Sequence, residues 1–311
     1  MGHVAVHASC STDGCSRCIV HRYNVEFIAV SEYWTTTDPK LVVAAMRAVA
    51  ALTHFPPGLL PLIASFLGAD SILVVGGILC QTMVATSVCY SLTSNSWRTD
   101  VPSMRTAQRG SPAAVAIGGR MMVFGGYDAG GQSLASCESF DPTTNEWSAL
   151  PRMSTPRHQA CAVEWKGRIF VFGGWRCNTG PLSSAECFDP MLNRWFAIEP
   201  MSTARFCAAA VAVPDRGILV MGGHNTVYLQ SAELYDPATN RWTMMNWNLP
   251  KRLRSFAAHC IDGVLHIFGG FNLDDGAISQ CWSMNLGEAT LTWSPLPSLP
   301  IPLDSVASVS I

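Results

Sequence analysis

Residues 168–175 read RIFVFGGW, an apolar run that stops at two glycines and is followed by a large aromatic residue. The run has the length and composition of a buried β-strand. A strand that ends in glycines can open a phosphate-binding turn, or it can be one copy of a structural repeat. A phosphate turn needs a following helix and a Lys, Ser or Thr at a fixed offset, and this sequence has neither. The rest of the chain indicates a repeat.

The glycine pair occurs five times, at spacings of 49, 48, 49 and 47 residues. The pairs occupy residues 76–77, 125–126, 173–174, 222–223 and 269–270. Each pair is followed at a similar distance by a tryptophan, and these are Trp97, Trp147, Trp195, Trp242 and Trp293. A period of this length that holds two markers in register indicates a propeller or a solenoid.

Each unit has the pattern of four short strands. A run of small and apolar residues comes first, as in RHQACAVE at 157–164, and the strand before the glycines follows it. The third strand ends at an Asp-Pro turn, as in AECFDPMLNRW at 185–195, and the tryptophan opens the fourth. Pro presets φ at the first corner of a turn, and Asn tolerates a left-handed backbone. The units show no helical pattern, so the predicted fold class is all-β.

The Gly-Gly after the second strand, the aromatic residue before Asp-Pro and the spaced tryptophan together resemble the kelch repeat. The resemblance covers residues 71–311 and implies a β-propeller with one four-stranded blade per repeat. Five tryptophans then predict a five-bladed propeller. The stretch 302–311, PLDSVASVSI, matches the inner strand that the first unit lacks, so we expect it to close the ring. Residues 25–34 have an aromatic pair at repeat spacing, which leaves a sixth blade as the alternative.

The residues before the propeller divide into two segments. Residues 1–36 read as a disordered leader, and residues 37–70 as a short helical segment that begins at Thr-Asp-Pro. Within the second segment, FPPGLLPLIASFLG at 55–68 resembles the opening of an F-box, and an amphipathic segment packed on the propeller is the alternative. The leader carries three cysteines and a histidine that could ligate zinc. A second short pair of ligands is missing from the leader, so no metal site is predicted. This set is Cys10, Cys15, Cys18 and His21.

The composition restricts the classes of partner. Apolar residues make up 49% of the chain and charged residues 14%, with a net charge of −2 and no basic block. This balance argues against a nucleic-acid surface, and no apolar run is long enough to span a bilayer. Twelve cysteines in 311 residues are too sparse for a disulfide scaffold. We therefore expect reduced thiols and a cytoplasmic protein, with the nucleus as the alternative.

Two sets of positions recur in the units without being identical. One set directly follows the glycines, and the other precedes the inner strands. The first comprises Tyr127, Trp175, His224 and Phe271, and the second comprises Arg109, Arg157, Arg205 and Arg254 with His158 and Phe206 beside them. The kelch resemblance places both sets in loops at one mouth of the central channel, where partner segments dock. Arg254 lies 15 residues before its glycine pair and the other arginines lie 16 or 17 residues before theirs, so its alignment with them is approximate.

Arginines and aromatic rings at a channel mouth favour an acidic or phosphorylated protein segment as partner. The alternative is that the arginines bridge blades and the aromatic residues cap the fold. Glu138, Glu186 and Glu233 recur at one place in the unit, which is typical of scaffold rather than of an active site. We therefore predict a protein-interaction module without a cofactor, rather than an enzyme. The resemblance also leaves a substrate receptor of a cullin-based ubiquitin ligase, and a sugar-isomerising kelch enzyme, as alternatives.

Overall fold

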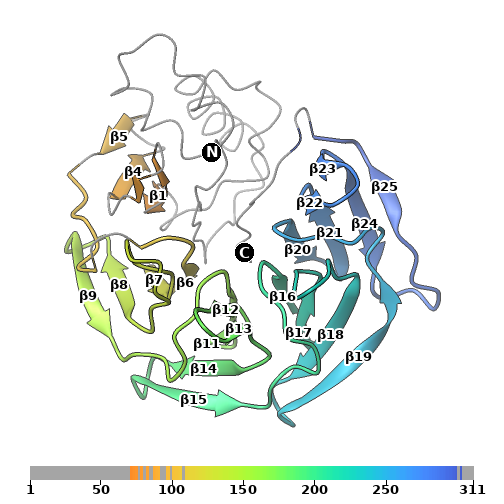
Figure 1. Cartoon of the computed structure of the whole chain (residues 1–311), viewed down its shortest axis with the longest axis horizontal. Helices are drawn as coiled ribbons and strands as arrows, with labels where there is room; N and C mark the ends of the chain where they lie inside the picture. Colours follow the sequence, from red (N-terminus) through yellow and green to blue (C-terminus); the bar gives the residue numbers. More distant parts are fainter. Residues whose placement is uncertain are drawn as a thin grey trace.

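The computed structural model describes residues 71–75, 78–79, 82–83, 87–91, 96–98, 100–106, 109–299 and 302. These residues form β-strands and turns, without a helix among them. The four-stranded sheets stand around a common centre, each with one edge strand facing inward and one facing outward (Figure 1). This arrangement is a β-propeller, and it confirms the all-β prediction. Within the described part of the chain, no helix is long and apolar enough to cross a membrane.

Four of the sheets are complete blades of four antiparallel strands, numbered here from the N-terminal side. Blade I contains β6 (Ala113–Ile117), β7 (Arg120–Phe124), β8 (Cys137–Asp141) and β9 (Glu146–Leu150). Blade II contains β10 (Cys161–Trp165), β11 (Arg168–Phe172), β14 (Ala185–Asp189) and β15 (Arg194–Ile198). Blade III contains β16 (Ala209–Val213), β17 (Gly217–Met221), β18 (Ser231–Asp236) and β19 (Arg241–Asn248). Blade IV contains β20 (Ala257–Ile261), β21 (Val264–Phe268), β24 (Cys281–Asn285) and β25 (Ser294–Leu296).

The prediction of five four-stranded blades is corrected to four among the described residues. The unit that starts at residue 71 forms a sheet of three strands, β1 (Ser71–Val75), β4 (Ser87–Ser91) and β5 (Ser96–Arg98). These strands match the second, third and fourth strands of a blade, because β1 directly precedes a glycine pair. The inner strand expected at 302–311 lies outside the described residues except for residue 302, and so do residues 1–70 with the F-box-like stretch and the cysteine-rich set.

The turns follow the sequence prediction. The asparagine of each Asp-Pro hairpin has a left-handed backbone, with φ of 57° at Asn145, 50° at Asn193 and 54° at Asn240. After the glycine pairs, the chain forms small two-stranded hairpins that rise from the blades. They are β2 (Ile78–Leu79) with β3 (Thr82–Met83), β12 (Trp175–Arg176) with β13 (Gly180–Pro181), and β22 (Phe271–Asn272) with β23 (Gly276–Ala277).

The repeated tryptophans join neighbouring units. The ring of Trp195 in blade II packs edge-on against Phe124 of blade I at 5.5 Å, and Trp242 of blade III packs in the same way against Phe172 of blade II at 5.4 Å. Each indole also donates a hydrogen bond to a backbone carbonyl that precedes its own blade, and this carbonyl lies in the linker for three of them and in the last residue of β19 for Trp293. These bonds are Trp147 to Pro102, Trp195 to Pro151, Trp242 to Glu199 and Trp293 to Asn248, at 2.7–2.9 Å.

Candidate functional site

The glycine pairs hold the backbone at one mouth of the propeller. Gly174 has a φ of 95°, and a Cβ at this position would lie 2.7 Å from the carbonyl oxygen of His158. Because no side chain separates the two segments, the residue after each pair forms a backbone bridge with the loop before an inner strand. These bridges join Tyr127 to Gly110, Trp175 to His158, His224 to Phe206 and Phe271 to Arg254.

The bridges bring the two variable sets of the sequence side by side. We call the resulting surface the rim, and all its side chains are half-buried. It comprises Tyr127, His158, Trp175, Phe206, His224, Tyr228, Arg254 and Phe271. Seven of these eight residues were predicted from the sequence as partner-binding residues, and Tyr228 was not.

The aromatic rings of the rim form a contiguous row across blades II, III and IV. Trp175 meets Phe206 edge-to-face with 5.1 Å between ring centroids, and Phe206 meets His224 in the same way at 4.9 Å. Tyr228 continues the row, 4.7 Å from His224 and 6.1 Å from Phe271. The first two contacts are edge-to-face, a favoured geometry for such rings, whereas Tyr228 lies tilted to His224 and stacked with Phe271. The row is therefore a continuous, packed aromatic surface.

Arg254 is the cation at the end of this row. Its guanidinium lies 4.5 Å from the ring centroid of Phe271 and 5.7 Å from that of Tyr228, and its Nε donates a hydrogen bond to the Tyr228 hydroxyl at 3.2 Å. Stacking of this kind orients the planar guanidinium on the surface. The backbone bridge to Phe271 places Arg254 at the position that His158 and Phe206 occupy in the preceding blades.

The other three arginines lie inside the blades, which corrects the prediction that they face a partner. Arg109, Arg157 and Arg205 are at most 1% exposed. Nη1 of Arg205 donates to the carbonyls of Gly222 and Ser231 at 2.8 and 3.0 Å, and its Nη2 bonds the Glu233 carboxylate at 2.7 Å. Arg109 and Arg157 make the corresponding bonds, to Glu138 and Glu186. Their guanidinium groups are fully enclosed and structural in role, but each binds the blade that it precedes and does not bridge two blades.

The recurrent glutamates complete this internal network. Glu233 accepts hydrogen bonds from the backbone N–H groups of Ser202 and Thr203 at 2.8 and 3.2 Å, so it ties the incoming linker to the blade. Burial alone would raise the pKa of Glu233, but hydrogen bonds from Ser202 and Arg205 and the charge of Arg205 outweigh it and lower the pKa. The carboxylate is therefore ionised at neutral pH and matches the buried guanidinium. The scaffold interpretation of the glutamates is confirmed.

Blade IV replaces the whole network with apolar groups. Leu253, with 0% exposure, takes the place of the buried arginine, since its carbonyl accepts the Gly223 N–H as the Arg205 carbonyl accepts that of Gly174. Trp282 stands at the position of the glutamate and packs in the same apolar cluster as Leu253. Pro250 stands at the position of Ser202 and has no N–H that needs an acceptor. This is why Arg254 sits one position later, on the rim.

The two rim histidines are neutral at physiological pH. Burial lowers the pKa of His158, and burial together with the positive charge of Arg254 lowers the pKa of His224. Nδ1 of His158 is hydrogen-bonded to the hydroxyl of Ser133 at 3.0 Å, which fixes the orientation of the ring. The rim therefore offers aromatic surface and hydrogen-bonding nitrogens beside a single side-chain cation.

Tyr228 was missed because it lies in a loop of variable length with no repeat register. The position of Tyr228 follows from a local turn, which is closed by a hydrogen bond from the Val227 N–H to the side chain of Asn225 at 3.0 Å. The turn brings Tyr228 back beside His224, with which it forms a backbone bridge. An Asn directly after the aromatic position was the available clue.

Among the described residues, no group of three or more His, Cys, Asp or Glu side chains is placed to hold a metal ion.

Comparison with known proteins agrees with the propeller architecture. No curated protein matches the chain. The model of the KLHDC2/KLHL20/DRC7 Kelch-repeats domain matches residues 63–270, more than half of the chain. The repeats, the propeller and this match together show that the chain belongs to the kelch-repeat family of the KLHDC2/KLHL20/DRC7 type.

Proposed function

We propose that this protein is an interaction module that binds a segment of a protein partner on the rim. The observation that carries the proposal is the contiguous row of half-buried rings from Trp175 to Phe271. Aromatic side chains that are already packed supply contact area at little cost in conformational entropy. Such rows are typical of the centre of a protein interface rather than of exposed scaffold.

The partner segment proposed here combines apolar side chains with an acidic or phosphorylated group. The apolar side chains contact the rings, and the acidic group meets Arg254, whose guanidinium is oriented by Phe271 and Tyr228. A guanidinium binds carboxylate and phosphate oxygens through paired hydrogen bonds. With Arg109, Arg157 and Arg205 enclosed, the electrostatic part of recognition depends on Arg254.

Affinity capture with rim variants tests the proposal. Trp175→Ala and Arg254→Ala should lose a shared set of partners that the wild-type chain captures. Arg120→Ala is the matched control, because Arg120 is an exposed arginine at the opposite end of a blade, paired with Asp141 at 2.8 Å. Phosphatase treatment of the extract separates a phosphorylated segment from an acidic one. An unchanged partner set in both rim variants would overturn the proposal.

A second candidate is a substrate receptor of a cullin-based ubiquitin ligase. The F-box-like sequence at 55–68 favours it, with the rim holding the substrate. Deletion of residues 55–68 should then remove a co-purifying ligase adaptor while the rim partners stay bound. Seven cysteines have side chains that the structure describes, and all seven are free thiols, which supports a reducing compartment such as the cytoplasm for either role.

A further inference from the structure

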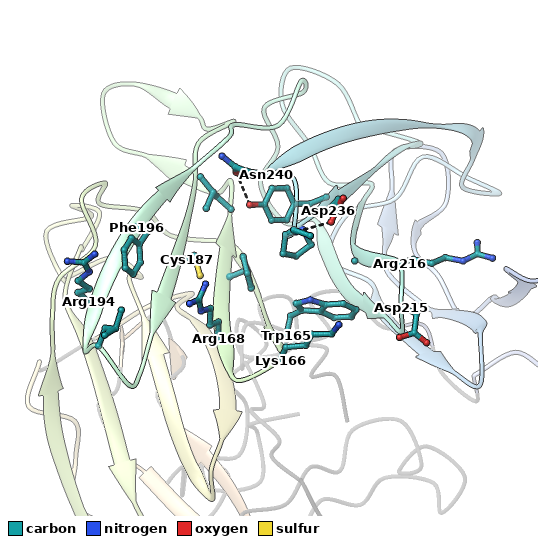
Figure 2. Close-up of a pocket in the computed structure, with 17 residues that line it drawn as sticks. Trp165, Lys166, Arg168, Cys187, Arg194, Phe196, Asp215, Arg216, Asp236 and Asn240 are labelled. Carbon is teal, nitrogen blue, oxygen red and sulfur yellow. Dashed lines mark hydrogen bonds between the residues drawn. The ribbon is translucent and has the colours of Figure 1, made fainter.

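A second surface lies at the other end of the strands, on the face formed by the strand hairpins. A groove of about 870 Å³ separates the hairpin ends of blades II and III (Figure 2). Arg168, the first residue of β11, lines this groove, whereas the glycine pair after the same strand leads to the rim. The groove and the rim are therefore on opposite faces of the propeller. Its size suits a group of side chains from a ligand or peptide.

Three departures from the repeat meet at this groove, and the first is Trp165. This residue ends β10 and projects between the two blades (Figure 2). The equivalent positions of the other complete blades hold Ile117, Val213 and Ile261. Trp165 is half-buried and carries the ammonium of Lys166 above its ring, 5.3 Å from the ring centroid. The groove thus has an aromatic floor that the other units lack.

The second departure is the Asp-Pro hairpin of blade II. Its two central residues are Met191 and Leu192, which are 92% and 57% exposed. Blade I has Thr143 and Thr144 at these positions, and blade III has the similarly small pair Ala238–Thr239. Two large apolar side chains exposed side by side at a turn offer apolar area whose burial by a partner is favourable. Leu192 lines the groove, so this hairpin extends its apolar wall.

The third departure is Gly217 at the start of β17. Blades I and II carry an arginine here, and each pairs with the aspartate of its Asp-Pro hairpin, Arg120 with Asp141 at 2.8 Å and Arg168 with Asp189 at 3.0 Å. Gly217 has a φ of 126°, and any Cβ at this position would clash with the carbonyl oxygen of Tyr235. Blade III therefore has no long side chain across its hairpin end, and the space beside blade II stays open.

The lining of the groove carries more cations than carboxylates. Lys166, Arg194 and Arg216 stand against Asp215 and Asp236, and the fourth cation, Arg168, is already paired with Asp189. Asp236 already accepts hydrogen bonds from the Ala238 N–H and the Thr239 hydroxyl, at 2.9 and 2.8 Å. Arg216 and Asp215 extend outward on the far hairpin (Figure 2). Charge complementarity therefore favours an acidic occupant on the side of Lys166 and Arg194.

We propose that this groove is a second docking site, for a segment of a protein partner in which an apolar side chain is flanked by Asp or Glu. The apolar side chain packs between Trp165 and Leu192. The flanking carboxylates meet Lys166 and Arg194, whose charged groups are held over the rings of Trp165 and Phe196. With one site on each face, the propeller can hold two segments at once, and the second site does not depend on the first.

Selection from a random twelve-residue peptide library on the full chain tests the site, with fluorescence anisotropy of the enriched peptides as the readout. Enriched peptides should include a class with an apolar residue between acidic ones. Leu192→Asp should weaken their binding about tenfold, as expected for a central contact residue, and Lys166→Glu should weaken it and reduce its dependence on salt. Thr144→Asp, the same change at the same hairpin position of blade I, is the matched control and should leave binding unchanged.

Trp175→Ala separates the two sites, because it alters the rim and leaves the groove intact. Loss of binding in Trp175→Ala but not in Leu192→Asp would assign the acidic-apolar peptides to the rim and overturn the groove proposal. Absence of such a class among the enriched peptides would overturn it as well. A second copy of this chain is the remaining possible occupant of the groove, and sedimentation of the wild type and of Leu192→Asp tests it. A wild-type dimer that Leu192→Asp loses would show that the groove holds a second copy, and it would overturn the proposal.

Discussion

Arg205 and Leu253 occupy the same buried position in neighbouring blades, and the one is charged whereas the other is apolar. Arg205 is enclosed with its carboxylate partner, and Leu253 is enclosed in an apolar cluster. A buried ion pair contributes little net stability compared with well-packed apolar residues, but removing one partner strands the other charge away from water. Blade IV accordingly has apolar residues at all three positions of the network, namely Leu253, Trp282 and Pro250.

The first prediction concerns this network. Arg205→Leu should lower the free energy of unfolding by about 3–5 kcal/mol, because Glu233 keeps a buried charge without its guanidinium. Chemical denaturation measures the loss. Arg120→Leu, at the pair with Asp141 in which the side chains are 56% and 18% exposed, should cost below about 1 kcal/mol. Equal losses in the two variants would contradict the assignment of Arg205 to the scaffold.

A second prediction concerns pH. Burial, with the neighbouring His266 adding to it, lowers the pKa of His259 from 6.5 to about 4. Between these values the unfolded chain binds the proton and the folded chain does not, so stability falls as pH drops from 6.5 towards 4. The contribution amounts to about 3 kcal/mol at most. His259→Phe should flatten the dependence of the unfolding free energy on pH in this window, and an unchanged slope would contradict the prediction.

At the scale of the strand and its loop, the sequence located the rim but not all its members. The glycine pairs gave the register for Tyr127, Trp175, His224 and Phe271, and backbone bridges now fix the residues opposite them. Spacing alone grouped Arg254 with the buried arginines. In blade IV the buried position belongs to Leu253, and Arg254 is the next residue along the chain. Exposure at one end of a strand depends on contacts between distant segments, which a repeat alignment does not contain.

A third prediction tests the close approach at the glycine pair. Gly174→Ala should lower the free energy of unfolding by about 3 kcal/mol or more, since it combines an unfavourable positive φ with a clash against the His158 carbonyl. Gly167→Ala is the matched control: its φ is 79°, and nothing lies within 4 Å of the added Cβ. This control should cost about 1 kcal/mol. Thermal or urea unfolding measures both, and similar losses would show that the close approach is unimportant.

At the scale of the whole molecule, the period of the glycines and tryptophans indicated a propeller or a solenoid, and the resemblance of the repeat to the kelch motif selected the propeller. The number of complete blades could not be predicted in this way, because the unit at residue 71 has only three strands among the described residues. The groove between blades II and III was also beyond the sequence. It arises from Trp165, Leu192 and Gly217, which lie on three separate hairpins and are unremarkable one at a time.

A fourth prediction concerns closure of the ring. We expect residues 302–311 to supply the inner strand of the β1–β4–β5 sheet. Their deletion should then speed amide hydrogen exchange in Ser71–Val75 and Ser87–Ser91, because the sheet loses its protected inner edge. Exchange in β17 of blade III serves as the internal reference. Unchanged exchange in β1 and β4 would show that the ring is closed in another way.

The hydrogen bonds of the tryptophan indoles have an evolutionary consequence. Three of the four indoles bind the linker that enters their own blade, so each of these blades and its connector form one stretch of about one repeat period. Duplication of such a stretch of the gene would carry the bond between blade and connector with it. The packing of the tryptophan on the preceding blade, as of Trp195 on Phe124, would have to form again with a new neighbour.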